Sequence, residues 1–305
     1  LGDFAYGTAI TGSRGLIKSG LNTLALSGAS TYDAGTWIAE GRVVLGADQA
    51  LGTGGLVLGG PGTAGALSLS NASQTVNGSM LVRSTTGSTN TIHIGAGQSL
   101  VVMGDVTNGV ATPSVTRLAV DGPGTWAVTN ASGRFQVGAV PDDSAHVATV
   151  DLSALGSFSA DLGDGILRVG QSGGTTGNAT NTLRLATNST IVARIIGVGD
   201  ATSKFVGPNE LYLGAGETRF YADNLLVAGG KSASILAFAG PSGTLTLSNQ
   251  AGTGRANLAI GVNLLGTGAH VPGILDTRGH DVSLYLGAVT NGGRRSSLTG
   301  SSAGY

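Results

Sequence analysis

Short runs of alternating apolar and polar residues, each ended within a few positions by Gly, Asn, Asp or Ser, constrain this chain most. Between residues 14 and 59 the runs are Thr23–Leu26, Trp37–Ala39, Arg42–Leu45 and Leu56–Leu58. Alternation with a period of two places one side of each run in a core and the other in water, which is typical of β-strands. Gly, Asn and Asp supply the tight corners between runs. Because no window has helical spacing, the pattern predicts strands and corners throughout.

The same unit recurs along the whole chain as a short apolar run that closes on glycine. Several neighbouring copies are separated by roughly 25 to 35 residues, the scale of one coil or more of a solenoid. The copies are Val43–Gly46, Leu56–Gly59, Ile92–Gly95, Phe135–Gly138, Leu167–Gly170, Ile195–Gly197, Leu211–Gly214, Leu258–Gly261 and Leu284–Gly287. Proline presets φ at a turn and glycine takes the left-handed position that follows. We therefore also expect corners at Pro61–Thr63, Pro123–Thr125 and Pro241–Thr244.

Composition supports an elongated repeat protein. The 305 residues include 54 glycines, 41% hydrophobic and 11% charged residues, with a net charge of −1. This chain is too apolar for disorder, and its glycines lack the three-residue period of collagen. We predict an all-β fold: a right-handed single-stranded parallel β-helix (β-solenoid) with irregular coil lengths, in which residues 1–305 form one domain. About 12 coils of about 25 residues, stacked about 4.8 Å apart, would give a rod on the order of 55–60 Å long.

One stretch also has a specific order of elements. It runs Gly15–Gly20, Thr23–Gly28, Thr31–Tyr32, Gly35–Thr36, Gly41 and Ala50–Gly54. This order, over residues 14–59, resembles the autotransporter-associated β-strand repeat of bacterial passenger domains. Ala34 departs from the family, which usually has glycine there, and Trp37 is bulkier than usual. The resemblance implies a parallel β-solenoid exported to the cell exterior, and it implies no enzymatic activity.

Charge, cysteine content and hydropathy exclude several classes of partner. Near-zero net charge gives no electrostatic reason to bind nucleic acid or an anionic membrane. The absence of Cys excludes a disulfide framework and thiolate metal sites. The sequence contains no apolar run of 18 residues, so no membrane-spanning helix is predicted. The strand pattern is already present at Leu1, and no signal peptide is recognised. We expect an extracellular or cell-surface protein, and a segment or processed product of a longer precursor.

The residues that could carry chemistry are dispersed. The histidines His93, His146, His270 and His280 lack metal-ligand spacing; His93 should point outward from a strand, and Arg278–Asp281 should be a polar corner. The isolated turns Gly163–Gly165 and Gly199–Asp200 do not form a calcium-binding repeat. No Gly-x-Ser-x-Gly motif lies between a strand and a helix. We predict no catalytic, cofactor-binding or metal site, and no cofactor.

Two further sets of polar residues remain open to interpretation. A polysaccharide-cleaving enzyme would need two carboxylates roughly 5–10 Å apart. The acidic candidates are Asp142, Asp143, Asp161, Asp164 and Asp200, too widely spread for the sequence to pair them.

Asn-x-Ser/Thr motifs make candidate N-glycosylation sites, with solvated turn asparagines as the alternative. They occur at Asn71, Asn77, Asn130, Asn178 and Asn188.

The sequence thus favours a non-catalytic extracellular rod with a structural or adhesive role. The alternatives are a fibre subunit that stacks end to end and a β-helix that binds or cleaves polysaccharides. The expected partners are other copies, through open strand edges at the solenoid ends, and host-surface or matrix glycans. Residues 1–6 should begin a strand, and 296–305 should form a polar, flexible tail. Protruding loops are expected at Gln171–Thr182 and Val140–His146.

Overall fold

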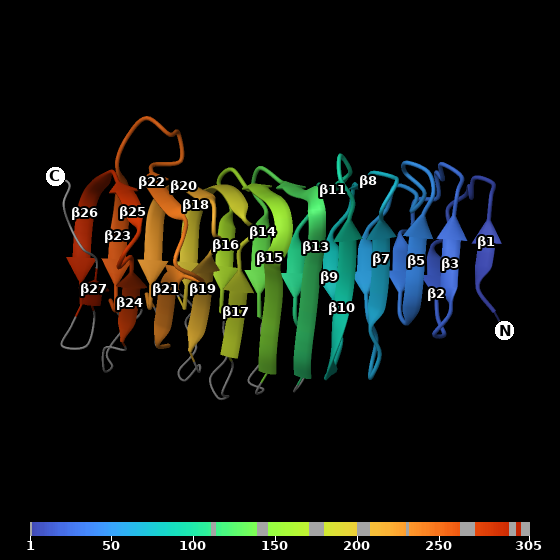
Figure 1. The fold of residues 1–305 in the computed structure, drawn as a ribbon, viewed down its shortest axis with the longest axis horizontal. Coiled ribbons are helices and arrows are strands. Elements are labelled where there is room, and N and C mark those ends of the chain that lie inside the picture. Colours follow the sequence, from blue (N-terminus) through green and yellow to red (C-terminus); the bar gives the residue numbers. More distant parts are fainter. Residues whose placement is uncertain are drawn as a thin grey trace.

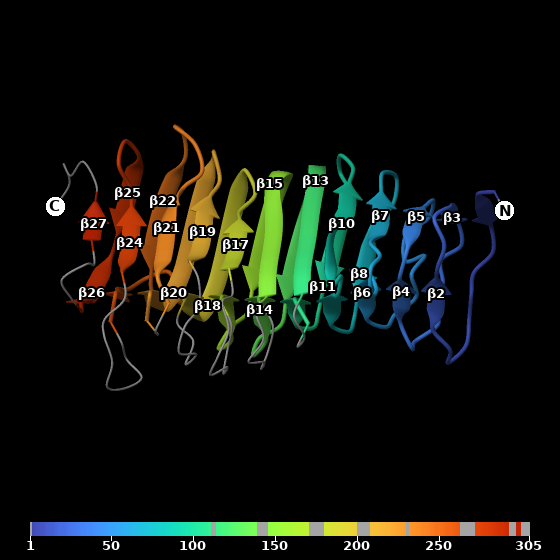
Figure 2. The same cartoon turned by 90° about the horizontal axis from the view of Figure 1, so that it is seen from below.

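The chain folds into a β-solenoid, shown in Figure 1 as a row of strands along one long axis. The structure is a computed structural model that describes residues 2–110, 114–138, 146–170, 180–199, 208–229, 232–262, 272–292 and 297–299. These residues contain 27 strands and no helix, and every pairing between named strands is parallel. The N-terminal coils and the C-terminal coils lie at opposite ends of the long axis in both views (Figures 1 and 2). The prediction of an all-β parallel β-solenoid is therefore confirmed.

The strands form three ladders, which we number by their order around a coil. The first ladder contains β1 (Phe4–Tyr6), β3 (Thr23–Leu26), β5 (Gly41–Leu45), β7 (Gly65–Leu69), β10 (Thr86–Ile94), the N-terminal parts of β13 (Ser114–Thr129) and β15 (His146–Asp161), β17 (Thr180–Arg184), β19 (Asn209–Leu213), β21 (Ser234–Phe238), β24 (Gly273–Asp276) and β27 (Ser297–Thr299).

The second ladder contains β8 (Gln74–Val76), β11 (Ser99–Val102), the C-terminal parts of β13 and β15, the N-terminal parts of β18 (Asn188–Val198) and β20 (Glu217–Val227), β22 (Thr244–Ser248) and β25 (Asp281–Leu284). The third ladder contains β2 (Leu16–Lys18), β4 (Thr36–Ile38), β6 (Leu56–Leu58), β9 (Met80–Val82), β12 (Val106–Asn108), β14 (Arg134–Val137), β16 (Ile166–Val169), the C-terminal parts of β18 and β20, β23 (Ala256–Ile260) and β26 (Leu286–Asn291).

The alternation seen in the sequence decides which side chains enter the core. In the first ladder Val43, Leu67 and Ile92 align in successive coils, and all three are buried. Val44 and His93, which follow Val43 and Ile92, face outward. The aligned inward side chains therefore pack on similar side chains in the neighbouring coils. Burying such columns of aliphatic side chains is the main stabilising contribution to the fold.

The coils are unequal in length, and the predicted count of about 12 needs correction. Leu24 aligns with Val43 in the next coil, whereas Leu236 aligns with Leu275, which is roughly twice as far along the chain. The second ladder has eight strands and begins only at β8. In the part of the chain that the structure describes, a complete three-stranded turn is therefore repeated fewer times than predicted.

Two central strands run through a corner that the sequence predicted as a break. β13 and β15 each have 16 residues and contribute to both the first and the second ladder. The predicted corner at Pro123–Thr125 lies inside β13, because parallel pairing with β15 resumes on both sides of a register shift there. Gly122 allows the bend, since its φ of +103° is accessible mainly to glycine.

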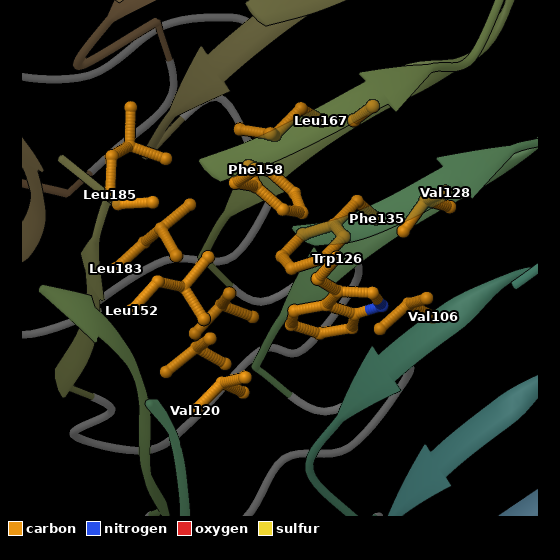
Figure 3. Close-up of a cluster of buried hydrophobic side chains, with 14 of the residues drawn as sticks. Val106, Val120, Trp126, Val128, Phe135, Leu152, Phe158, Leu167, Leu183 and Leu185 are labelled. Carbon is orange, nitrogen blue, oxygen red and sulfur yellow. The ribbon is translucent and has the colours of Figure 1, made fainter. Parts of the chain in front are cut away.

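Three aromatic side chains of the core meet at these central coils. Trp126, Phe135 and Phe158 come from three different strands, and their ring centroids are 5.4 to 5.6 Å apart. Figure 3 shows the three rings together, with Val106, Val128 and Leu167 among the labelled aliphatic side chains around them. Tilted and edge-on ring pairs at this distance add to the stabilisation that their buried area provides.

The predicted N-terminal strands are confirmed within a residue or two, and two predicted irregular segments need correction. Thr180–Arg184 is strand β17, so the end of the expected 171–182 loop pairs with the first ladder. Ser297–Thr299 is strand β27, so this part of the expected polar tail also belongs to the solenoid. Residues 171–179, 139–145 and 300–305 lie outside the described residues.

Glycines at the end of third-ladder strands make room for buried amide side chains of the first ladder. Gly138 has a φ of +119°, and a Cβ added there would lie 2.8 Å from Oδ1 of Asn181. Asn181 donates from Nδ2 to Oδ1 of Asn209 (2.8 Å), and Asn209 donates to Oγ of Ser232 (2.9 Å). All three polar residues are buried. The glycine that ends the apolar run at this corner thus leaves room for the buried, hydrogen-bonded side chains of Asn181, Asn209 and Ser232.

The first coils differ from the central ones. Lys18 occupies the inward position that Ile38 and Leu58 occupy in the next two coils. Its ammonium donates to the carbonyl oxygens of Ser19 (3.1 Å), Gly20 (2.5 Å) and Glu40 (3.0 Å). Burial lowers the pKa of Lys18 from its ordinary value, partly opposed by the negative charges of Glu40 and Asp3.

Candidate functional site

His93 is exposed on the first ladder, as predicted, and pairs with a carboxylate in the next coil. Its Nδ1 lies 2.5 Å from Oδ1 of Asp121, and the two side chains are 44% and 54% exposed. Because both side chains are exposed to solvent, this contact contributes little to stability. No third His, Cys, Asp or Glu of the described chain is grouped with this pair so that it could hold a metal.

The other predicted acidic and histidine residues do not converge on a metal site. Asp161 and Asp164 are exposed, and Asp161 accepts a hydrogen bond from the backbone N–H of Gly163 (3.3 Å). Asp142, Asp143, Asp200, His270 and the side chain of His146 lie outside the described residues. Within the described ranges no three His, Cys, Asp or Glu side chains are grouped so that they could hold a metal ion.

The candidate glycosylation sites lie at the surface where they can be placed. Asn71, Asn77 and Asn188 are exposed, and Asn130 is half-buried. Asn130 donates from Nδ2 to Asp105 (3.0 Å), and Oδ1 of Asn188 accepts from the backbone N–H of Glu217 (3.0 Å). Asn178 lies outside the described part. Glycosylation at these residues stays a prediction.

An apolar row follows the outer face of the third ladder over the first four coils. Ile17, Trp37, Val57 and Leu81 are aligned in successive strands and face outward. Ile17 is 63% exposed. Trp37 is fixed in place because its Nε1 donates to the carbonyl oxygen of Gly59 (2.8 Å) and the guanidinium of Arg83 lies 5.6 Å from its ring centroid.

A groove of about 350 Å³ runs beside this row. Its floor is backbone, because Gly15, Gly35 and Gly55 align in neighbouring coils with Ser79 at the end. A Cβ on any of these three glycines would lie 2.6 to 2.8 Å from a carbonyl oxygen of the next coil. The groove can cover apolar surface of a ligand, but it contains no titratable side chain.

A second, smaller hollow of about 170 Å³ lies where the first ladder turns into the second near the C-terminal coils. We name it the His280 notch; its lining residues are Ala237, Phe238, Asp276, Arg278 and His280. The His280 ring stacks on Phe238, with centroids 3.7 Å apart and planes within 5°. Arg278 and Asp276 form a two-point ion pair, with Nε to Oδ1 at 3.0 Å and Nη2 to Oδ2 at 2.6 Å.

The coils next to the notch carry a second cation–aromatic pair. Arg184, Tyr212, Ala237 and Asp276 occupy one outward column in four successive coils. The guanidinium of Arg184 lies 4.6 Å from the centroid of the Tyr212 ring. Burial raises the pKa of the Tyr212 hydroxyl, and the negative charge of Glu210 raises it further. The small side chain of Ala237 leaves the other side of Tyr212 without a large neighbour in that column.

The sequence identified only part of the notch. The predicted polar corner Arg278–Asp281 is confirmed in part, since Thr277 to His280 form a turn before β25. Phe238 was missed, because it is distant in sequence from His280 and only the register between coils brings the two rings together. Unequal coil lengths hide that register in the sequence.

Together the fold and these surfaces define a parallel β-solenoid. No family model, no curated protein and no solved structure matches the chain. Among the residues that the structure describes, none belongs to a helix long and apolar enough to cross a bilayer.

Proposed function

We propose that this chain is a non-catalytic structural and adhesive rod, exported to the cell surface as part of an autotransporter-passenger-type protein. The stacked ladders carry the proposal. The first ladder alone connects strands from Phe4 to Thr299 through parallel pairing. A chain built this way holds each outward side chain at a fixed height along one axis. Such a shaft suits the display of contact surfaces away from a cell.

The placement outside the cell rests on the order of elements in residues 14–59. The same residues form the two-stranded first coils, in which β2, β4 and β6 contribute Ile17, Trp37 and Val57 to the apolar row of the third ladder. A contiguous row of apolar side chains at the surface favours contact with another surface. The adhesive role follows from combining this row with the rigid shaft.

Surface digestion and an adhesion assay test both halves of the proposal. Intact cells that make the protein are treated with protease, and fragments of residues 14–59 are sought in the supernatant. Beads coated with the purified chain are then counted on glycan-coated and matrix-coated surfaces. We expect surface fragments and bead retention above that of albumin-coated beads. Protection of the chain until cells are lysed would contradict the export proposal.

A folded shaft is required for adhesion under this proposal, so a core variant provides the control. Phe158→Asp places a charge in the aromatic core and should abolish ladder formation and retention together. Met103→Asp, at a residue that is 50% exposed, should leave both unchanged. Equal retention of Phe158→Asp and wild-type beads would show that the chain sticks without its fold, and would overturn the adhesive role.

The fibre alternative receives less support from the ladders. In the described residues the second ladder starts only at β8, so direct stacking of β25 on the first coils of another chain would leave that ladder unpaired. One of the three ladders would therefore be interrupted at every junction. Electron microscopy at increasing protein concentration separates the two ideas: we expect separate short rods, and long unbranched filaments would favour the fibre.

A further inference from the structure

We propose that the His280 notch binds a single uncharged pyranose ring of a carbohydrate. The ring would lie with its apolar C–H face toward Ala237 and Phe238, and its hydroxyl groups would reach Arg278 and His280. This ligand site adds to the proposed rod and does not depend on the protein's location in the cell. The observations that carry it are the shape, the fixed polar groups and the local charge.

The size of the notch limits the ligand to one sugar unit. Its volume of about 170 Å³ is below the roughly 300–1,000 Å³ typical of pockets for drug-sized molecules. Ala237 makes the floor, because its neighbours in the same outward column are the larger Tyr212 and Asp276. Phe238, on which His280 stacks, lines the hollow next to Ala237, and an aromatic side chain beside a small one suits the apolar face of a ring.

The polar groups of the notch are held before a ligand arrives. Asp276 accepts two hydrogen bonds from Arg278, and this pairing favours one orientation of the guanidinium, whose side chain is 71% exposed. Nδ1 of His280 lies 3.3 Å from the carbonyl oxygen of Gly243, which can only accept. The neutral ring therefore carries its proton on Nδ1 and presents Nε2 as an acceptor. Fixed donors and acceptors reduce the ordering cost of binding.

Charge favours an uncharged ligand over an anion. The positive charge of Arg278 is compensated by Asp276, and Asp281 adds an exposed carboxylate directly after His280. A phosphate, sulfate or sugar acid would meet these carboxylates, whereas a hydroxylated ring can donate to an acceptor and accept from a guanidinium at once.

Titration with simple sugars tests the proposal. Imidazole signals of His280 are followed by NMR while methyl glucoside, methyl galactoside, methyl mannoside and N-acetylglucosamine are added separately to the full chain. We expect at least one sugar to shift these signals saturably, with a Kd on the order of 1 mM because the site is small and open. No shift with any of the four at about 50 mM, far above that Kd, would overturn the proposal.

Two variants separate the notch from other sugar contacts. Ala237→Leu fills the floor from an outward position and should raise the Kd at least about tenfold, equivalent to about 1.4 kcal/mol. Ala66→Leu makes the same change at an outward position of the same ladder in β7 and should not. If Ala237→Leu fails to fold, Arg278→Gln serves instead, since it keeps size and removes the guanidinium. Unchanged affinity in the folded variant, or tighter binding of inorganic sulfate than of any sugar, would contradict the inference.

Discussion

The cores of the first coils and of the central coils are filled by different kinds of side chain. From β1 to β6 each coil is short and has two strands, and Lys18 occupies an inward position. In the central coils three ladders enclose the aromatic core of Trp126, Phe135 and Phe158. The comparison teaches that the coils with three ladders enclose a cluster of aromatic rings, whereas the two-stranded coils bury aliphatic columns and the ring of Tyr32.

Removal of an aromatic ring from the central core should have the largest effect on the free energy of unfolding. Phe158→Ala should lower the free energy of unfolding by about 3–5 kcal/mol, because the ring is buried between two other rings and the cavity cannot close. Urea unfolding followed by circular dichroism measures the change. Met103→Ala, at an exposed position, is the control and should change it by less than about 0.5 kcal/mol. A loss below about 1 kcal/mol for Phe158→Ala would show that the central core is loosely packed.

Corner glycines should differ between the two regions. Gly138→Ala should cost about 2–3 kcal/mol, because its left-handed backbone disfavours a side chain and Asn181 occupies the space. Gly62 also has a positive φ, of +78°, but open space surrounds it, so Gly62→Ala should cost only about 1–2 kcal/mol for the backbone. Thermal unfolding of both variants gives the comparison. A larger destabilisation at Gly62 would contradict the account of the corner.

Buried amides should be more costly to lose than exposed ones. Asn209→Ala removes hydrogen bonds with Asn181 and Ser232 in the interior and should cost about 1–3 kcal/mol. Asn257→Ala removes one hydrogen bond, to Asn224 in an exposed column, and should cost less than about 0.5 kcal/mol. If both substitutions lowered the free energy of unfolding equally in urea, water would have to reach the hydrogen-bonded side chains around Asn209, which would contradict their burial.

The smallest expected effect is a pH dependence confined to the first coils. Burial lowers the pKa of folded Lys18 below 10.5, so the unfolded chain binds more protons just below that value. Stability of these coils should therefore rise as pH increases toward 10.5. Hydrogen exchange of β2 and β4 measures it, and Lys18→Met should remove the rise. Burial raises the pKa of Tyr32, which gives the opposite slope above pH 10 and is removed by Tyr32→Phe. A slope that survives both substitutions would contradict this assignment.

The local sequence pattern predicted the strands. The register between coils determines which polar residues are buried and which distant side chains meet. Alternation at Thr23–Leu26 and Leu56–Leu58 predicted β3 and β6 with their bounds. Nothing local marks Asn209 as buried or Lys18 as inward, because each depends on which residue of the neighbouring coil it faces. The same holds for Phe238 and His280. Because the longest coils are roughly twice the length of the shortest, no fixed period can supply that alignment.

Distances along the third ladder test the central claim, a single axis with coils stacked in register. Because the chain has no Cys, pairs of cysteines can carry spin labels at chosen outward positions. From Ile17, the ladder reaches Thr107 after four coils, Arg168 after six and Leu226 after eight. At about 4.8 Å per coil, pulsed EPR should give backbone separations from Ile17 of about 19 Å to Thr107, about 29 Å to Arg168 and about 38 Å to Leu226. Separations that stop rising, or fall, between Thr107 and Leu226 would contradict the solenoid.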